Sequence, residues 1–484
     1  MDLRTLKNIS KFIATIGLAL ALFLLIPIVT GWLYGEKMHA FLLFDLIFLG
    51  FNAAVYLLLY RHDLQMRIKD SILSVNLIWV LLGVAGAVPL WLYTHVTPSE
   101  AFFEAISGFT TTGATIYSDI ESLPHAILML RSLMHWLGGM GIIVLGVGLF
   151  SLINPTGSLT MFKAESTGIR MEKITPKIKD TALRLWLIYL FLTFLDALLL
   201  KLGGMSLFDA VNHAFSTIST GGFSTKNASL GYWGGNDYIL WVTTIFMTLS
   251  GINFLAHLRL WGGDLSGYRS EEVRWYLIIF VVLSLLLTLV HALGSHDGIG
   301  YSATHAFLTI SSVLTTTGFA SLDYERWGSA AIAIVFVAMF VGGNAGSTAG
   351  GVKVIRYIVL FKNMFLQMRA ILHPNAVSGI FIDQGRIGSK ILGSVSGFFL
   401  LFVMTNTIVT LYLYISGYDP MTSISTAVAC VGNIGPGFGA TGPAQNYHLF
   451  SDTQKVVLAI AMIIGRLEFY TVMILLSRDF WKRY

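Results

Sequence analysis

The sequence predicts an all-α membrane protein that crosses the bilayer many times, and three observations lead to this fold class. Of the 484 residues, 55% are hydrophobic and only 12% are charged, about half the charged fraction of a soluble domain. The chain contains repeated apolar runs of about 20 residues, the length that a helix needs to cross a ~30 Å hydrocarbon core. A short pattern recurs between these runs in four places. A soluble globule of this composition would have too little polar surface to cover its core.

Ten apolar runs are long enough to be transmembrane helices. The first follows the basic residues Arg4, Lys7 and Lys11, as a secretory signal does, but it is long and lacks a small-x-small cleavage site, so we expect a spanning helix. The single cysteine, Cys430, excludes an internal disulfide framework. The ten runs are residues 12–33, 40–60, 71–93, 126–150, 184–202, 238–260, 275–293, 329–361, 391–416 and 453–476.

The basic residues are distributed unevenly between the two sets of loops. If the amino terminus is cytoplasmic, ten crossings return the carboxyl terminus to the same side, and most of the 31 Lys and Arg residues then lie in loops on that side. This is the positive-inside pattern of membrane proteins. We therefore expect both termini in the cytoplasm, and the net charge of +5 needs no nucleic-acid partner to explain it.

Four semi-apolar segments, residues 99–110, 206–219, 302–314 and 420–430, are too short to span a membrane. Each precedes a turn that can be aligned with the others on one glycine, which reveals an internal repeat. Two spanning helices fall within each unit, so the four units have the same orientation in the membrane. The aligned turn residues are Thr111, Thr112 and Gly113; Thr220, Gly221 and Gly222; Thr316, Thr317 and Gly318; and Asn433, Ile434 and Gly435.

The repeated turns predict a pore for a cation. A helix of about 12 residues covers only ~18 Å, so each short segment must enter the membrane and return. Irregular backbone at that depth is tolerated only where protein buries it or where it lines a water-filled path. Glycine permits positive φ angles that turn carbonyl groups toward an axis, and Thr or Ser adds oxygen ligands. We expect the four turns to form the narrowest ring of this pore and to coordinate a cation through oxygen atoms.

The full prediction is an all-α polytopic membrane protein with ten transmembrane helices. Four parallel helix–pore-helix–filter–helix repeats surround a pseudo-fourfold pore, and an amino-terminal helix pair precedes them. The expected boundaries are residues 1–62 for the helix pair, followed by 63–165, 166–265, 266–372 and 373–484 for the first to fourth repeats.

The eighth run, residues 329–361, would be about 50 Å long as one helix, so we expect a break within it. Half of the positions from Gly342 to Gly351 are glycine, at a cost of roughly 1 kcal/mol each in a helix. We interpret this segment as an intramembrane loop that can obstruct the pore. The alternative is a small-residue face for helix packing. The glycines are Gly342, Gly343, Gly346, Gly350 and Gly351.

Arg466 lies in the middle of the last apolar run. A charge at that depth costs at least ~2.5 kcal/mol, so it must face protein or water. One interpretation is an electrostatic barrier that slows cations below the turns. The alternative is a cation satisfied by the carbonyl ends of the short helices or by a buried acid.

The four turns, the ten-helix count with an extra amino-terminal pair and the pair Gly465-Arg466 resemble the TrkH/TrkG branch of the Trk/Ktr/HKT potassium transporters over essentially the whole chain. The resemblance implies K⁺ uptake across the bacterial inner membrane through a filter of the twelve turn residues, gated by the Gly-rich loop and Arg466. It further implies a homodimer, a cytosolic nucleotide-binding ring of TrkA type as regulator, and no cofactor besides the K⁺ substrate. Asn433 and Ile434 depart from the Thr of the other turns.

Two other functions are weighed against this hypothesis. Asp45 and Asp196 are acids within apolar runs, so they could couple K⁺ movement to H⁺ or Na⁺. The alternative is an ordinary structural role, in which each carboxyl group forms a buried hydrogen bond or extends to the membrane surface. An intramembrane enzyme is not expected, because the spans contain no His-Glu-x-x-His motif, no nucleophile with a base and no paired catalytic Asp motif.

Overall fold

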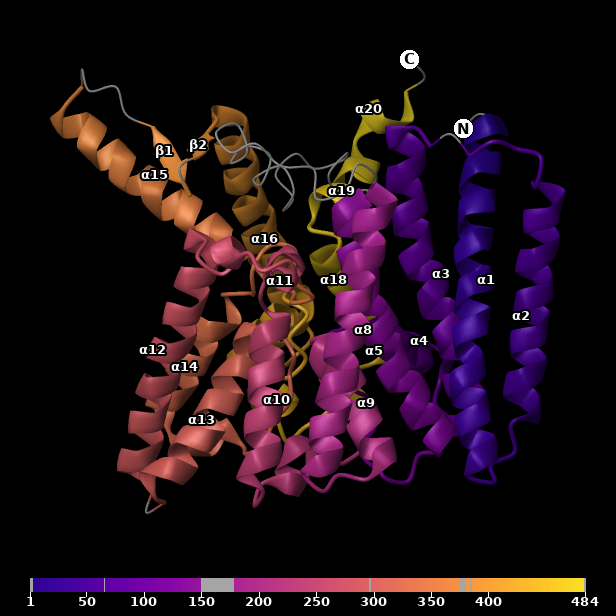
Figure 1. Ribbon diagram of the computed structural model, residues 1–484, viewed down its shortest axis with the longest axis horizontal. Coiled ribbons are helices and arrows are strands. Elements are labelled where there is room, and N and C mark those ends of the chain that lie inside the picture. Colours follow the sequence, from indigo (N-terminus) through magenta and orange to yellow (C-terminus); the bar gives the residue numbers. More distant parts are fainter. Residues whose placement is uncertain are drawn as a thin grey trace.

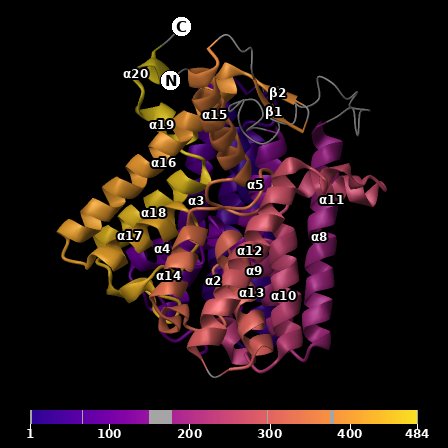
Figure 2. The same cartoon turned by 90° about the vertical axis from the view of Figure 1, so that its left-hand side faces the viewer.

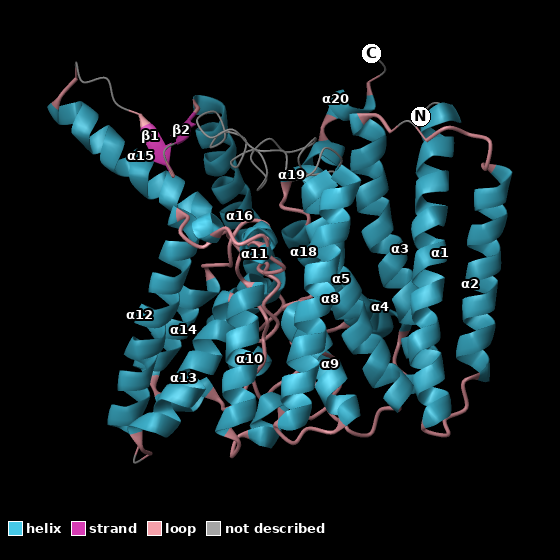
Figure 3. Cartoon of the chain, in the orientation of Figure 1, coloured by secondary structure: helices cyan, strands magenta, loops and turns pink. Residues whose placement is uncertain are grey.

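The computed structural model describes residues 3–64, 66–148, 178–295, 297–374, 379–383 and 385–482. This part of the chain is almost entirely helical (Figure 3). The helices stand side by side in one bundle, and the start of α1 and the carboxyl-terminal α20 lie at the same end of it (Figure 1). The loops gather at the bundle ends and in its centre (Figure 3).

Among the described residues, seven helices contain at least 20 residues and follow the predicted apolar runs. Six of them are long and apolar enough to cross a membrane, or up to eight spans exist in the described ranges if two bent helix pairs are counted. α5 lies in a further predicted run whose end falls outside the described residues. The long helices are α1 (Leu3–Leu33), α2 (His39–Leu58), α3 (Ile68–Thr94), α5 (His125–Gly148), α8 (Ile178–Leu202), α12 (Glu271–Gly294) and α16 (Ser389–Ile415).

Three predicted runs are not continuous helices. Run 238–260 forms α10 (Asp237–Ser250) and α11 (Phe254–Trp261), which meet at 97°. Run 329–361 forms α14 (Ser329–Met339) and the start of α15 (Val354–Leu372), as its length and glycine content predict. Run 453–476 forms α18 (Asp452–Arg466), α19 (Tyr470–Met473) and a short turn, bent by 110°. A single straight helix through Arg466 was therefore the wrong expectation.

The four short segments are confirmed as helices: α4 (Pro98–Phe109), α9 (Leu207–Ile218), α13 (Ile299–Leu314) and α17 (Pro420–Val431). Three of them begin at a side chain that accepts a hydrogen bond from the third residue of the helix, namely Thr97, Ser206 and Asp419. Proline occupies the first helical position of α4 and α17, where its missing N–H costs nothing. Every one ends directly before a predicted turn, so local sequence accounts for the last residue of all four helices and, through the caps, for the first residue of three.

The short helices are arranged cyclically. Each packs against the long helix that precedes it in the chain: α4 on α3, α9 on α8, α13 on α12 and α17 on α16. Each also packs against the helix that closes the previous unit: α9 on α5, α13 on α10, α17 on α14 and α4 on α18. The last of these contacts joins the two ends of the series, so the short helices and the helices beside them form a closed circle.

The remaining elements are short. β1 (Ile380–Ile382) and β2 (Gly385–Ile387) pair antiparallel with Phe381 opposite Arg386. This hairpin and the end of α15 lie at the same end of the bundle as α20 (Arg478–Trp481) (Figures 1 and 2). The 3₁₀ turns are η1 (Ser229–Trp233), η2 (Leu265–Gly267), η3 (Tyr324–Trp327), η4 (Gly439–Thr441), η5 (Tyr447–Leu449) and η6 (Ile474–Leu476).

Large apolar side chains are exposed on the outside of the bundle, for example Leu58 on α2 and Leu293 on α12. Polar side chains such as Thr111, Ser216 and Asn344 are instead buried. This distribution is the opposite of a soluble protein and fits a chain whose outer surface faces lipid and whose interior carries the polar groups.

Candidate ion pathway

The four turns share one backbone conformation. The residue two positions before each glycine has a positive φ angle of 55–58° in Thr111, Thr220, Thr316 and Asn433. The glycines Gly113, Gly222, Gly318 and Gly435 have φ angles of 80–96°. A β-branched threonine rarely adopts a positive φ, and such strain of about 1–3 kcal/mol persists only where the surroundings impose it. The internal repeat seen in sequence is therefore repeated in strained backbone geometry.

The glycines bring the turns into contact with one another. A Cβ atom added to Gly113 would lie 2.2 Å from the Gly221 carbonyl oxygen, and one on Gly222 would lie 1.9 Å from that of Thr317. Two more pairs close the series: a Cβ atom on Gly318 would lie 2.3 Å from the Ile434 carbonyl oxygen, and one on Gly435 would lie 2.5 Å from that of Thr112. These contacts join eight of the twelve predicted turn residues, two from each turn, into one closed ring of backbone, in which only glycine leaves room for the neighbouring carbonyl group.

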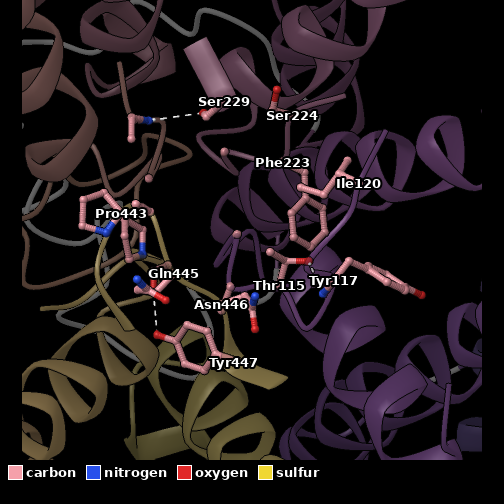
Figure 4. Close-up of a pocket in the computed structure, with 18 of the residues that line it drawn as sticks. Thr115, Tyr117, Ile120, Phe223, Ser224, Ser229, Pro443, Gln445, Asn446 and Tyr447 are labelled. Atoms are coloured by element: carbon pink, nitrogen blue, oxygen red, sulfur yellow. Dashed lines mark hydrogen bonds between the residues drawn. The ribbon is translucent and has the colours of Figure 1, made fainter. Parts of the chain in front are cut away.

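A cavity of about 120 Å³ opens on one side of this ring. Its lining includes all four ring glycines and segments that follow them, among them Thr115, Phe223 and Tyr447 (Figure 4). The Tyr447 hydroxyl donates a hydrogen bond to the Gly435 carbonyl over 2.6 Å. The cavity is therefore a mouth that leads to the ring, and it is framed by segments from all four units.

Side chains of the ring bind to each other and to nearby carbonyl groups. The Asn433 amide donates to the Thr112 hydroxyl and to the Met462 carbonyl, both over 3.0 Å. Thr315 and Thr317 share a hydrogen bond of 2.7 Å between their hydroxyl groups. Asn433, which replaces the threonine of the other turns, therefore ties the fourth turn to the first.

The Gly-rich loop lies on the side of the ring away from the mouth. Its Gly350 N–H donates to the Thr316 hydroxyl over 2.6 Å. The Thr348 hydroxyl donates to the Ile218 carbonyl at the end of α9 over 3.1 Å. A Cβ atom on Gly350 would lie 2.6 Å from the Gly432 carbonyl oxygen. These contacts place the loop directly against three of the four units, so a continuous helical packing face, the alternative interpretation of these glycines, is wrong.

A fold-back within the loop explains its other glycines. The Gly342 N–H donates to the Val352 carbonyl over 2.8 Å, and a Cβ on Gly342 would lie 2.4 Å from the Gly350 oxygen. Gly346 and Gly351 have φ angles of 75° and 67°, which side chains rarely adopt. The loop is thus a compact, defined structure.

Arg466 is buried at the point where α18 ends. Its guanidinium donates to the Thr348 carbonyl of the loop over 3.0 Å and to the Gly138 carbonyl of α5 over 3.3 Å. Glu468 pairs instead with Arg356 on α15 at 2.6 Å. Two of the guanidinium nitrogens of Arg466 are therefore bound by carbonyl groups, as one alternative allowed, but these belong to the loop and α5 rather than to the short helices, and the buried Nε has no hydrogen-bond partner among the described residues.

Comparison with known proteins identifies the family of the chain. Residues 37–262 and 272–483 match the model of the TrkH family, described as a cation transport protein. The chain belongs to the TrkH family. It is 35% identical to the Trk system potassium uptake protein TrkG of Escherichia coli K12, over 96% of each chain, and 37% identical to TrkH of Salmonella typhimurium LT2, over 87% and 88%. The crystal structure of the potassium transporter TrkH from Vibrio parahaemolyticus superimposes with a TM-score of 0.89 at 32% identity, over 99% and 100% of the two chains.

Membership of the TrkH family makes the chain a multi-pass membrane transporter and not an enzyme. The two intramembrane acids of the alternative hypothesis lie outside the ring in this TrkH-family fold: Asp45 is buried on α2 of the amino-terminal pair, and Asp196 is buried on α8.

Several residues around the pathway were missed from sequence. Arg131 is only 1% exposed and pairs with Glu104. His135 is fully buried and contacts the Gly108 carbonyl and the Phe223 N–H. The spacing of Arg131 and His135, four residues apart in an apolar run, is the one sequence signal that places both on one helix face.

Proposed function

We propose that this chain takes up K⁺ across the bacterial inner membrane through the ring of four turns, which acts as a selectivity filter. The closed ring of carbonyl groups around the four glycines carries the proposal. Carbonyl groups at such a constriction can replace the hydration shell of a monovalent cation. The printed names of the relatives, potassium uptake protein and potassium transporter, support K⁺ as the substrate.

The proposed architecture is a pseudo-fourfold pore made by one chain, with four repeats in the ranges 63–165, 166–265, 266–372 and 373–484. The cyclic contacts of the short helices support it. The positive-inside pattern supports cytoplasmic termini, with the mouth cavity facing outward. The ends of α4, α9, α13 and α17 point partial negative charge toward the space below the ring, which favours a cation there.

The proposed gate is the Gly-rich loop together with Arg466. Gly342, Gly343, Gly346, Gly350 and Gly351 let the loop fold against the ring, and the Arg466 guanidinium adds a positive charge on the same side. The hydrogen bonds of Thr348, which join the loop to α9 and Arg466, support a closed pathway. We further propose that the chain forms a homodimer and that a cytosolic nucleotide-binding ring of TrkA type opens the gate, since the relatives are named as parts of a Trk system.

The test is Rb⁺ uptake by purified protein in liposomes with Gly318→Ala. Its Cβ would lie 2.3 Å from the Ile434 oxygen, and φ at this position is +84°. We expect uptake to fall to background. The matched control is Gly328→Ala, which has a φ of +91° but open space around the added Cβ. Equal uptake by the two variants would reject the ring as the pathway.

A coupled transporter, in which Asp45 or Asp196 carries H⁺ or binds Na⁺ while K⁺ moves, is the second candidate. The burial of both acids inside the bundle favours it, because buried acids are rare in membranes and often functional. Reversal potentials under imposed pH and Na⁺ gradients separate the candidates. A reversal potential that follows K⁺ alone supports a channel, and one that follows the pH gradient supports coupling.

A further inference from the structure

A buried ion pair lies beside the ring, between the short helix and the closing helix of the first unit. The Arg131 Nε on α5 donates to the Glu104 Oε1 on α4 over 2.8 Å. The two side chains are 1% and 0% exposed. A buried ion pair is costly to form and contributes little net stability, so its presence calls for another explanation.

Glu104 binds the segment that follows the first turn. Besides Arg131, the Thr115 hydroxyl donates to its carboxylate over 3.0 Å, and the Ile116 N–H donates over 2.9 Å. Three donors converge on this one carboxyl group, which accepts a hydrogen bond from each of them. Thr115 lies two residues after Gly113, so Glu104 fixes the outer end of the first turn.

Arg131 reaches the second unit as well. Its guanidinium donates to the Ser224 carbonyl over 3.3 Å and lies 4.0 Å from the centre of the Phe223 ring. A guanidinium over an aromatic face is attracted by the ring quadrupole. Ser224 lies two residues after Gly222. The ion pair therefore clamps the outer ends of the first and second turns at equivalent positions.

In the described part of the chain, neutral groups join the segments that follow the turns at the other three junctions. These contacts are the Gly231 N–H to the Ala320 carbonyl over 3.2 Å, the Tyr324 hydroxyl to the Gly437 carbonyl over 3.0 Å, and the Tyr447 N–H to the Thr115 carbonyl over 2.8 Å. Charged side chains also bridge two of these junctions: Glu325 accepts a bond from the Gly439 N–H over 2.7 Å, and Lys455 pairs with Glu100 at 2.7 Å away from the ring.

His135, one helical turn after Arg131, makes a parallel link. One of its ring nitrogens contacts the Gly108 carbonyl at 2.8 Å, and the other accepts from the Phe223 N–H over 3.2 Å. A Cβ atom on Gly221 would lie 2.3 Å from the His135 ring. One face of α5 is thus wedged between the first two turns, and Arg131 is its charged end.

We propose that Arg131 and Glu104 are positioning residues that fix the spacing of the first and second turns and thereby contribute to the choice of K⁺ over Na⁺. The inference rests on the proposed function of the ring as a filter. K⁺ and Na⁺ carry the same charge and differ in size, so a ring distinguishes them by the number, spacing and rigidity of its carbonyl groups. A clamp that spans two turns restricts that spacing at one of the four junctions.

The test measures the reversal potential with K⁺ on one side of a bilayer and Na⁺ on the other. This potential reports the permeability ratio and does not depend on the number of active molecules, so poor folding alone leaves it unchanged. The variants are Glu104→Gln, Arg131→Gln and Thr115→Val. We expect the K⁺ over Na⁺ permeability ratio to fall roughly three- to tenfold in each, the range that the loss of one buried hydrogen bond represents.

Glu104→Gln leaves an unpaired positive charge near the mouth, and Arg131→Gln leaves an unpaired negative charge there. If the pair acted only through its charges, Glu104→Gln and Arg131→Gln would change the current in opposite directions. Within each variant the K⁺ and Na⁺ currents would change together, so the permeability ratio would stay the same. A positioning role lowers the ratio in both. If either protein is not recovered in folded form, Thr115→Val, which keeps the ion pair and removes one hydroxyl group, decides alone.

The matched control is Glu100→Gln, one turn earlier on α4. Glu100 forms a similar buried pair with Lys455 at 2.7 Å, at the start of the helix away from the ring. We expect a native ratio in this variant. A native ratio in all three test variants, or an equal fall in the control, would overturn the inference. Failure of the proposed function gives a different result, because the native protein itself would then show no preference for K⁺ over Na⁺.

Discussion

The backbone N–H of Gly350 donates a hydrogen bond to the Thr316 hydroxyl over 2.6 Å. This bond joins the Gly-rich loop to the ring residue that carries a strained φ of 58°. A loop held by its own backbone against the ring can leave only if several such bonds break together. The contacts that anchor the loop are therefore the places where substitutions should change ion flow.

Arg466→Ala should raise the passive Rb⁺ flux of the isolated protein. It removes the bonds to Thr348 on the loop and Gly138 on α5 and a positive charge beside the path. Loss of a charge-assisted hydrogen bond corresponds to about a tenfold change in an equilibrium, so we expect a flux increase of that order in liposomes. Arg326→Ala, which removes a surface arginine that is 84% exposed, is the control, and equal or lower flux in Arg466→Ala would contradict the barrier.

Glu272→Ala should also loosen the loop. The carboxylate on α12 accepts hydrogen bonds from the Ala345 N–H over 2.7 Å and the Ile355 N–H over 3.4 Å. Without it, both donors lose their partner, and we expect the basal flux to rise on the order of fivefold. The adjacent Glu271→Ala, which breaks only a partly exposed pair with Lys362, provides the comparison. Similar flux in the two variants would show that Glu272 does not hold the loop.

Asn433→Asp should destabilise the ring. The amide nitrogen donates two hydrogen bonds, and a carboxylate cannot donate either of them. Each buried group left unpaired costs about 1–3 kcal/mol, so we expect a lower Tm of the purified protein together with reduced Rb⁺ uptake. Asn446→Asp is the control, because its side-chain oxygen only accepts a bond from the His448 N–H and an aspartate can do the same. An unchanged Tm in Asn433→Asp would argue against the link between the fourth and first turns.

Labelling of an introduced cysteine should test the orientation. Cys430 is buried, so the native chain should react little with a membrane-impermeant thiol reagent. We expect Ser122→Cys, at an exposed position near the mouth, to be labelled in intact cells, and Asp63→Cys, exposed in the loop after α2, only after the membrane is opened. The reverse pattern would place the termini outside.

The sequence alone determined the class of the protein, the four short helices and the four turns. These features depend on local causes: apolar length, capping residues such as Thr97 and Asp419, and glycines that adopt positive φ angles. Because the same pattern recurs in each unit, comparison within the chain was enough to align the turns, and the backbone repeats the alignment in its φ angles.

Only the tertiary structure decided which groups meet across the units. Arg466 contacts Gly138, which lies 328 residues earlier in the chain, and Asn433 contacts Thr112, 321 residues earlier. The pairing of Arg131 with Glu104 and the bends after Ser250 and Arg466 were likewise not apparent from apolar runs. Hydropathy and spacing describe how one segment prefers to fold, whereas a buried charge finds its partners only when the closed circle of units brings distant carbonyl and carboxylate groups within hydrogen-bond distance.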